Sequence, residues 1–148
     1  MTDPRPSFEP DSCFAPGARD AADVVQVQRD GFLADAVGVQ LLEAMPGPAM
    51  VLNTRRQIVA ANRLLLALLG VDSINCLLAQ RPGEGLACVH AGDRPGGCGT
   101  SEACTQCGAV LAIMESLASR GRATRECRIL TLRDERAGAL DLRVHASF

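Results

Sequence analysis

A segment rich in cysteine and glycine, residues 85–107, most constrains how this chain can fold. It reads GLACVHAGDRPGGCGTSEACTQC and holds four of the chain's seven cysteines and one of its two histidines. The four cysteines, spaced C-x9-C-x5-C-x2-C, are Cys88, Cys98, Cys104 and Cys107. Glycine and proline interrupt helix and strand over much of this stretch, and a long loop inside a compact domain is usually functional. The chain therefore has to fold around a concentration of thiols that can bind a metal or react.

Composition narrows the classes of partner. The chain has 148 residues, 47% of them hydrophobic, which suffices for one core. It has no Trp or Tyr, four Phe and a net charge of -2, so it lacks the basic and aromatic surface that binds nucleic acid directly. No apolar run is long enough to cross a bilayer, and the first residues lack the features of a signal peptide. We therefore expect a cytoplasmic protein that binds neither nucleic acid nor membrane.

The number and clustering of the cysteines also fit a cytoplasmic protein. In a reducing cytosol a local cysteine cluster more often means metal or redox work than structural disulfides, and an odd count fits full pairing poorly. The sequence has no glycine-rich phosphate loop after a strand and no nucleophile elbow, and His90 lies only two residues after Cys88, a spacing that does not by itself make a catalytic dyad. We expect no enzyme and assign no catalytic residues.

The first 45 residues predict two segments outside the main domain. Residues 1–22 contain four prolines, scattered charges and no periodicity, which predicts a disordered Pro-rich tail. Residues 23–45 carry apolar side chains at the three-and-four spacing of an amphipathic helix, which Pro46-Gly47-Pro48 ends. Such a helix is either a dimer or signalling contact, or it packs on its own core.

Residues 46–148 predict an α+β domain, an antiparallel sheet flanked by helices with the Gly/Cys-rich loop inserted. The pattern predicts strands over residues 49–52 and 57–61, a buried helix over 63–69, a loop over 71–99, a helix over 100–119 and strands over 124–132 and 139–147. Asn62 is placed to cap the first helix and Gly70 to end it. The last strand alternates cleanly between apolar and polar residues, so we expect His145 on its solvent face.

This order of elements resembles a PAS domain, the small α/β sensor fold of signalling proteins. The most specific match is the segment AMVLNTRRQIVAAN, residues 49–62, in which a strand, a polar turn and a second strand ending in Asn lead into the first core helix. A PAS sheet has five strands and four are predicted here, so the resemblance implies a domain that lacks its last strand. It also implies a sensor or regulatory role, with an output module such as a histidine kinase or transcriptional activator as partner and a homodimer through the N-terminal helix or the sheet.

The cysteines strengthen the resemblance. Residues 97–107, with Cys88-Val-His90 before them and Thr124-Arg-Glu-Cys127-Arg after them, are similar to a cysteine-rich branch of PAS domains found in bacterial sensor proteins. Haem-binding PAS domains use a histidine on the long helix, and residues 100–119 contain none. Residues 75–80 partly resemble the motif of photosensory flavin members but lack its Arg and its aromatic residue.

The residues themselves predict a metal centre. Cys104 and Cys107 lie one turn apart at a helix start, where the dipole favours thiolates, and the loop glycines allow Cys88 and Cys98 to complete a four-thiolate site. Soft thiolates select zinc or iron–sulfur clusters. One close pair with two scattered cysteines suits an iron–sulfur cluster better than the two knuckles common in zinc sites. His90 is an alternative ligand.

Two alternatives stay open. Zinc would make the site a staple in a protein-interaction domain. Without a metal, oxidation could pair Cys104 with Cys107, or Cys88 with Cys98, as a redox switch. In either case we expect the remaining three cysteines to be incidental: Cys13 as an exposed thiol, Cys76 as a small buried or interfacial residue, and Cys127 as a half-buried strand residue.

Overall fold

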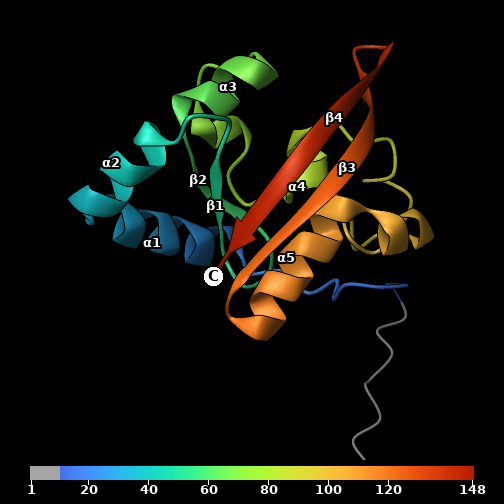
Figure 1. The fold of residues 1–148 in the computed structure, drawn as a ribbon, viewed down its shortest axis with the longest axis horizontal. Helices are drawn as coiled ribbons and strands as arrows, with labels where there is room; N and C mark the ends of the chain where they lie inside the picture. The colour runs from blue at the N-terminus through green and yellow to red at the C-terminus, as the bar shows by residue number, and fades with distance from the viewer. Residues whose placement is uncertain (1–10) are drawn as a thin grey trace, which may run out of the picture. The chain divides into compact units, whose positions relative to one another are not determined.

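The computed structural model describes residues 11–148, which divide into two compact units (Figure 1). The N-terminal unit is Arg19–Leu86, and the cysteine unit is Met1–Ala18 with Ala87–Phe148, of which residues 1–10 lie outside the described part. The elements of the N-terminal unit are α1 (Ala22–Leu33), α2 (Ala36–Ala44), β1 (Met50–Leu52), β2 (Ile58–Ala61), α3 (Arg63–Leu69), η1 (Ile74–Cys76) and α4 (Pro82–Gly85). Those of the cysteine unit are η2 (Glu102–Gln106), α5 (Gly108–Ser119), β3 (Arg122–Arg133) and β4 (Arg136–Ser147).

The chain is α+β, as predicted, but the described strands form two separate two-stranded antiparallel sheets, β1–β2 and β3–β4. A five-stranded sheet of the PAS kind is therefore not present among the described residues. None of the helices found in residues 11–148 is long and apolar enough to cross a membrane.

The N-terminal helix differs from the single helix expected over residues 23–45. The chain forms α1 and α2 instead, with a break at Ala34-Asp35. Asp35 has an extended backbone and its side chain accepts a hydrogen bond from the Val37 N–H at 3.1 Å, which makes it the N-cap of a new helix. A Cβ on Gly38 would lie 2.8 Å from the Asp35 carboxylate, so the glycine makes room for this cap.

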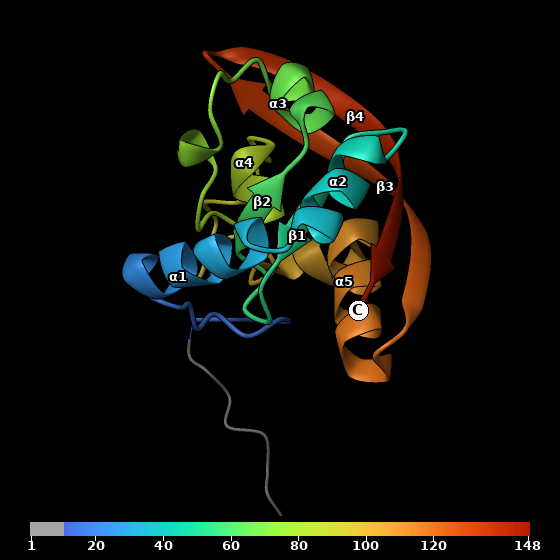
Figure 2. The ribbon, with the colours of Figure 1, turned by 90° about the vertical axis from the view of Figure 1, so that its left-hand side faces the viewer.

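The β1–β2 hairpin and the capped helix after it are confirmed. Ile58, Val59 and Ala60 of β2 are buried, and α1 packs beside this strand (Figure 2). The fully buried Asn62 side chain accepts from the Leu65 N–H and the Ala49 N–H, both at 3.0 Å, and donates to the Gly47 carbonyl at 2.8 Å. One amide thus caps α3 and fixes the proline turn that precedes β1.

Residues 71–86 form more structure than the loop expected there. Ser73 caps the short η1 turn through the Asn75 N–H. Glu84 in α4 accepts from the Arg81 N–H at 2.9 Å and forms an ion pair with Arg19. Polar groups of the N-terminal unit are therefore satisfied by local capping and by pairs within the same unit.

The cysteine unit begins with residues that the composition assigns to a disordered tail. Residues 11–18 instead lie against the glycine loop, where the Cys13 N–H donates to the Thr100 carbonyl at 2.8 Å and the Ala15 N–H to the Gly99 carbonyl at 3.0 Å. Ala15 is fully buried. The proline-rich composition does not predict this docking, because the docking depends on backbone carbonyls of a loop that is distant in the sequence. The rest of the predicted tail, residues 1–10, lies outside the described residues.

The helix expected over residues 100–119 is also divided in two. Ser101 caps the 3-10 helix η2, and Cys107 then takes an extended conformation and becomes the N-cap of α5. Helix α5 lies along β3 (Figure 2), and the side chains of Ala123, Cys127 and Ile129 are buried. The division places Cys107 at the junction between the two helices, beside the sheet.

The last two strands form a longer and more regular hairpin than expected. They pair without interruption from Arg122 opposite Ser147 to Arg133 opposite Arg136. The turn has only two residues, Asp134 and Glu135, both with positive φ, as tight hairpin turns require. Twelve residues on each side therefore stay in strict alternation between the two faces.

Candidate thiol site

Six of the seven cysteines lie in the cysteine unit, and five of these six gather together. Cys98, Cys104 and Cys107 pack around a small apolar cluster that includes the buried Ala15 and Val110. Cys88 lies close enough to Cys104 and Cys107 for their charges to affect its pKa, and Cys127 is in contact with Cys107. We call Cys88, Cys98, Cys104, Cys107 and Cys127 the cysteine cluster; none of the five is in a disulfide.

Within this cluster the sulfur atoms of Cys107 and Cys127 approach each other closely. Their sulfur atoms lie 3.7 Å apart, whereas a disulfide bond measures about 2.05 Å, so the two thiols are in contact and not bonded. Cys107 is the half-buried N-cap of α5, and Cys127 is a buried residue of β3. Two residues separated by 19 others in the chain thus have their sulfur atoms in contact.

Gly108 makes this approach possible. A Cβ at this position would lie 2.0 Å from the Glu126 carbonyl oxygen and 3.2 Å from the Cys127 Cβ. Any larger residue would push the start of α5 away from β3, because 2.0 Å is far inside van der Waals contact. The glycine after Cys107 therefore sets the distance between the two sulfur atoms.

The environment keeps two of the thiols protonated. Burial raises the pKa of Cys127, and the neighbouring Cys107 raises it further, although the backbone N–H groups of Ala109 and Gly108 at the start of α5 oppose the shift. Burial likewise raises the pKa of Cys88, against hydrogen bonds from the backbone of His90 and Ala91. Both groups are therefore neutral thiols at neutral pH, and ionisation needs a higher pH or a change in the loop.

The predicted metal ligands only partly converge. Cys98, Cys104 and Cys107 share one cluster with Cys88 beside it, but within residues 11–148 no group of three or more His, Cys, Asp or Glu side chains has a metal-binding arrangement. The Cys104 sulfur contacts the Ser101 hydroxyl at 3.8 Å. The donor set is chemically suited to zinc or an iron–sulfur cluster, since it consists of soft thiols.

His90, the alternative ligand, is engaged elsewhere. Its Nδ1 lies 2.8 Å from the Asp93 carboxylate, and both side chains are exposed. His145 lies on the outer face of β4, as expected, with its Nδ1 2.9 Å from the Thr124 hydroxyl. Neither histidine contributes to the cysteine cluster as it stands.

The other cysteines divide. Cys76, expected to be a small buried or interfacial residue, is exposed in η1 of the N-terminal unit. Cys13, expected to be an incidental exposed thiol, is half-buried, and its backbone N–H donates a hydrogen bond to the Thr100 carbonyl in the glycine loop. Cys127, expected to be an incidental half-buried strand residue, is buried, and sequence reasoning missed the contact of its sulfur with Cys107. A local signal for this contact is Gly108 directly after Cys107, since glycine allows two backbones to approach closely.

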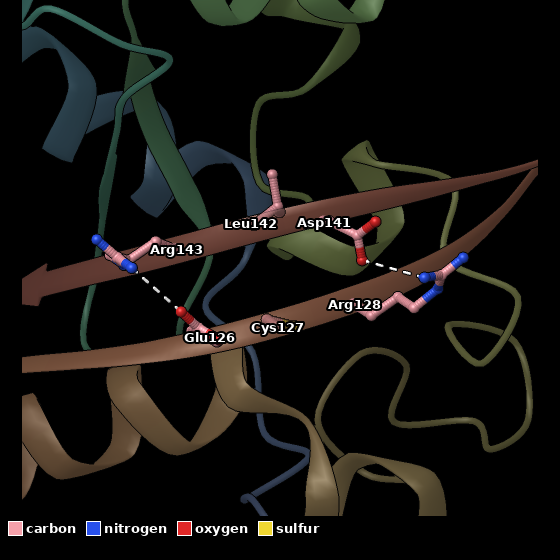
Figure 3. A pocket seen from close by; sticks show the side chains of 6 residues that line it. All are labelled: Glu126, Cys127, Arg128, Asp141, Leu142 and Arg143. Carbon is pink, nitrogen blue, oxygen red and sulfur yellow. Dashed lines mark hydrogen bonds and ion pairs between the residues drawn. The ribbon is translucent and has the colours of Figure 1, made fainter.

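A shallow groove of about 470 Å³ lies over the middle of the β3–β4 hairpin (Figure 3). Two cross-strand ion pairs cross it, Glu126 with Arg143 at 3.2 Å and Arg128 with Asp141 at 3.4 Å. The four charges alternate in sign and cancel, so the groove offers no excess charge to a charged small molecule. Cys127 and Leu142 lie opposite each other between the two pairs.

Comparison with protein-family models, with curated proteins and with solved structures finds no match to this chain. The function is therefore argued from the geometry of the cysteine cluster.

Proposed function

We propose that this chain is a redox-sensing regulatory domain, of the PAS-like type that its sequence resembles, in which Cys107 and Cys127 are the sensing thiols. The observation that carries the proposal is the 3.7 Å contact between their sulfur atoms, held by the Gly108 approach. The sequence left Cys104 with Cys107, or Cys88 with Cys98, as possible redox pairs; the proposal instead takes the pair that the packing of α5 on β3 brings into contact.

The chemistry needs a two-electron oxidant, and a hydroperoxide is the class that fits. Cys107, the more exposed of the two and the N-cap of α5, loses its proton and attacks the outer peroxide oxygen. The S–O bond forms, the O–O bond breaks, and hydroxide leaves and takes up the proton as water, so that Cys107 becomes a sulfenic acid. The Cys127 sulfur then attacks Cys107, the S–S bond forms, and water leaves with the oxygen. Two thiols lose two electrons and two protons, and hydrogen peroxide becomes two molecules of water.

The disulfide would couple this chemistry to the fold. Bond formation requires the sulfurs to approach by about 1.7 Å, from contact to bonding distance. The start of α5, the preceding η2 turn and the loop that carries Cys98 would shift with Cys107. An output module such as a histidine kinase or transcriptional activator would respond to that shift.

Peroxide treatment of the reduced protein tests the proposal. We expect loss of two free thiols, restored by dithiothreitol, and a cross-linked peptide pair containing Cys107 and Cys127 in a tryptic digest. Cys107→Ser and Cys127→Ser should each abolish the cross-link, while Cys76→Ser in the other unit should leave it intact. An unchanged thiol count, or a cross-link between other cysteines, contradicts the proposal.

The second candidate is the metal centre, which the packing of Cys98, Cys104 and Cys107 around one cluster favours. Cys88, Cys98, Cys104 and Cys107 would hold it: an iron–sulfur cluster would supply a redox-active or oxygen-sensitive group, and zinc would staple the loop in a protein-interaction domain. This chain's own contribution would be a glycine-rich loop able to bring Cys88 and Cys98 to the start of α5.

Anaerobic purification, visible absorption and metal analysis distinguish the two candidates. The metal centre predicts bound iron with sulfide, or zinc, that Cys104→Ala removes and Cys127→Ser retains. The thiol switch predicts the opposite sensitivity, since Cys127→Ser abolishes the oxidation while Cys104→Ala leaves it.

A further inference from the structure

One edge of the long hairpin carries no partner within the described residues. β4 pairs with β3 on one side only, and none of its residues is buried. An unpaired strand of this length presents a row of backbone donors and acceptors, which natural proteins cover, distort or use for association. The outer edge of β4 is therefore available to pair with another strand.

The register shows which residues face the edge. The Phe148 N–H donates to the Gly121 carbonyl at 3.1 Å, and Arg122 lies opposite Ser147 in the next position. Residues that exchange backbone hydrogen bonds alternate with residues that do not in an antiparallel pair. The even-numbered residues of β4 therefore bond to β3, and the odd-numbered ones, Asp141 and Arg143 among them, turn their N–H and C=O groups outward.

The side chains at the middle of the edge are complementary to themselves. Asp141 and Arg143 flank Leu142, which lies near the centre of β4. In an antiparallel pair of two β4 strands with Leu142 opposite Leu142, Asp141 of each copy faces Arg143 of the other. On the opposite face, Leu140 of each copy faces Val144 of the other. Cross-strand pairs of opposite charge, and of apolar side chains, are the ones that stabilise a sheet.

The charges also extend across the whole sheet that would result. Arg128 of β3 pairs with Asp141, and Glu126 pairs with Arg143, in the hairpin itself. Across the new edge the row would read Arg128, Asp141, then Arg143 and Glu126 of the second copy, alternating in sign throughout. A shift by two residues places Asp141 opposite Asp141, or Arg143 opposite Arg143, so the charges select one register.

We propose that the chain forms a homodimer by antiparallel pairing of β4 with β4 of a second copy, centred on Leu142, to give a four-stranded sheet. The proposal is independent of the redox function and of any metal. It assigns Asp141 and Arg143 the role of register-determining residues at the interface.

Light scattering and sedimentation velocity of the reduced full chain test it. We expect a dimer that dissociates on dilution. D141R places arginine at both edge positions and R143D places aspartate at both, so each variant alone should raise the dissociation constant at least about tenfold. An equal mixture of the two should associate again, because every facing pair is then of opposite charge.

Two further variants control for folding and for overall charge. Asp72→Arg makes the same charge change as D141R at an exposed position of the N-terminal unit and should leave the dimer unchanged. Ala139→Pro removes one outward N–H while its side chain stays small, and should abolish the dimer but keep the circular dichroism spectrum, since edge strands tolerate proline. A wild-type monomer at all concentrations, or single variants that dimerise like the wild type, overturns the proposal, as does a mixture that fails to associate.

Discussion

The two hairpins of this protein differ in length, regularity and burial. β1–β2 is short, three and four residues long, with a register shift between Val51 and Leu52 and a buried second strand. β3–β4 has twelve residues in each strand, no irregularity, and a second strand without a buried residue. The first hairpin is held by its surroundings, whereas the second has one edge without a partner among the described residues and buries Cys127 on the face that α5 covers. The hairpin with a buried strand is thus the irregular one, and the regular hairpin is the one whose second strand is exposed.

Removing the polar anchor of the short hairpin should have the largest effect on stability. Asn62→Ala leaves the Ala49 N–H without its acceptor and the Gly47 carbonyl without its donor, and the Leu65 N–H keeps only the backbone carbonyl of residue 62 at 3.1 Å. We expect a loss of about 4 kcal/mol in the free energy of unfolding, measured by urea denaturation. Asn75→Ala, at an exposed position, should change it by less than about 0.5 kcal/mol. A loss as small in Asn62→Ala would show that the amide does not anchor the hairpin.

Oxidation of the thiol pair at the long hairpin should stabilise the folded protein. A disulfide between Cys107 and Cys127 closes a loop of about 20 residues, which restricts the unfolded chain by about 3 kcal/mol. We expect the urea midpoint to rise on peroxide treatment and to return with dithiothreitol. In Cys127→Ser the midpoint should not respond to peroxide; a full response there would place the sensing pair elsewhere.

Enlarging Gly108 should separate α5 from the long hairpin. Gly108→Ala brings a Cβ against the Glu126 carbonyl, and we expect a loss of about 2 kcal/mol together with slower formation of the Cys107–Cys127 cross-link. Gly92→Ala is the matched control, because nothing lies within 4 Å of a Cβ at that position. Equal cross-linking rates in the two variants would contradict the role given to Gly108.

The smallest expected effect is a dependence of stability on pH, which tests the burial of Cys127. Its pKa is raised in the folded state by desolvation, so the folded protein holds the proton more tightly than the unfolded chain, whose thiol has the ordinary pKa of 9.0. The stability from this group is complete below pH 9.0 and is lost as the pH rises through the higher folded pKa. Urea denaturation between neutral pH and pH 10 should show this decline, and Cys127→Ala should reduce it. The same slope in both proteins would mean that Cys127 is not the titrating group.

Local signals predicted much of the fold correctly. Asn62 and Gly70 lie at the two ends of α3, as expected, because capping depends on residues within one turn. The breaks at Asp35 and Cys107 were missed, although Asp35 is a good N-cap residue, since the apolar stripe continues across both positions. Hydrophobic periodicity reports the buried face of a helix and does not report where the helix is interrupted.

The candidate site was predicted in part. The segment that carries Cys98, Cys104 and Cys107 does form one cluster, and Cys88 lies beside it. The partner of Cys107 could not be read from spacing, because Cys127 reaches it only through the register of β3 and the docking of α5. Ala15 was missed for the same reason, as its burial depends on the loop at Gly99.

The sequence by itself determined the α+β class, the capped helix after the first hairpin and the concentration of thiols in one loop, because each of these follows from the order of neighbouring residues. Only the tertiary structure decided that the chain divides into two units, that Cys107 meets Cys127 and that Asp141 and Arg143 lie on an open edge. These features depend on contacts between residues far apart in the chain, which composition and periodicity do not encode.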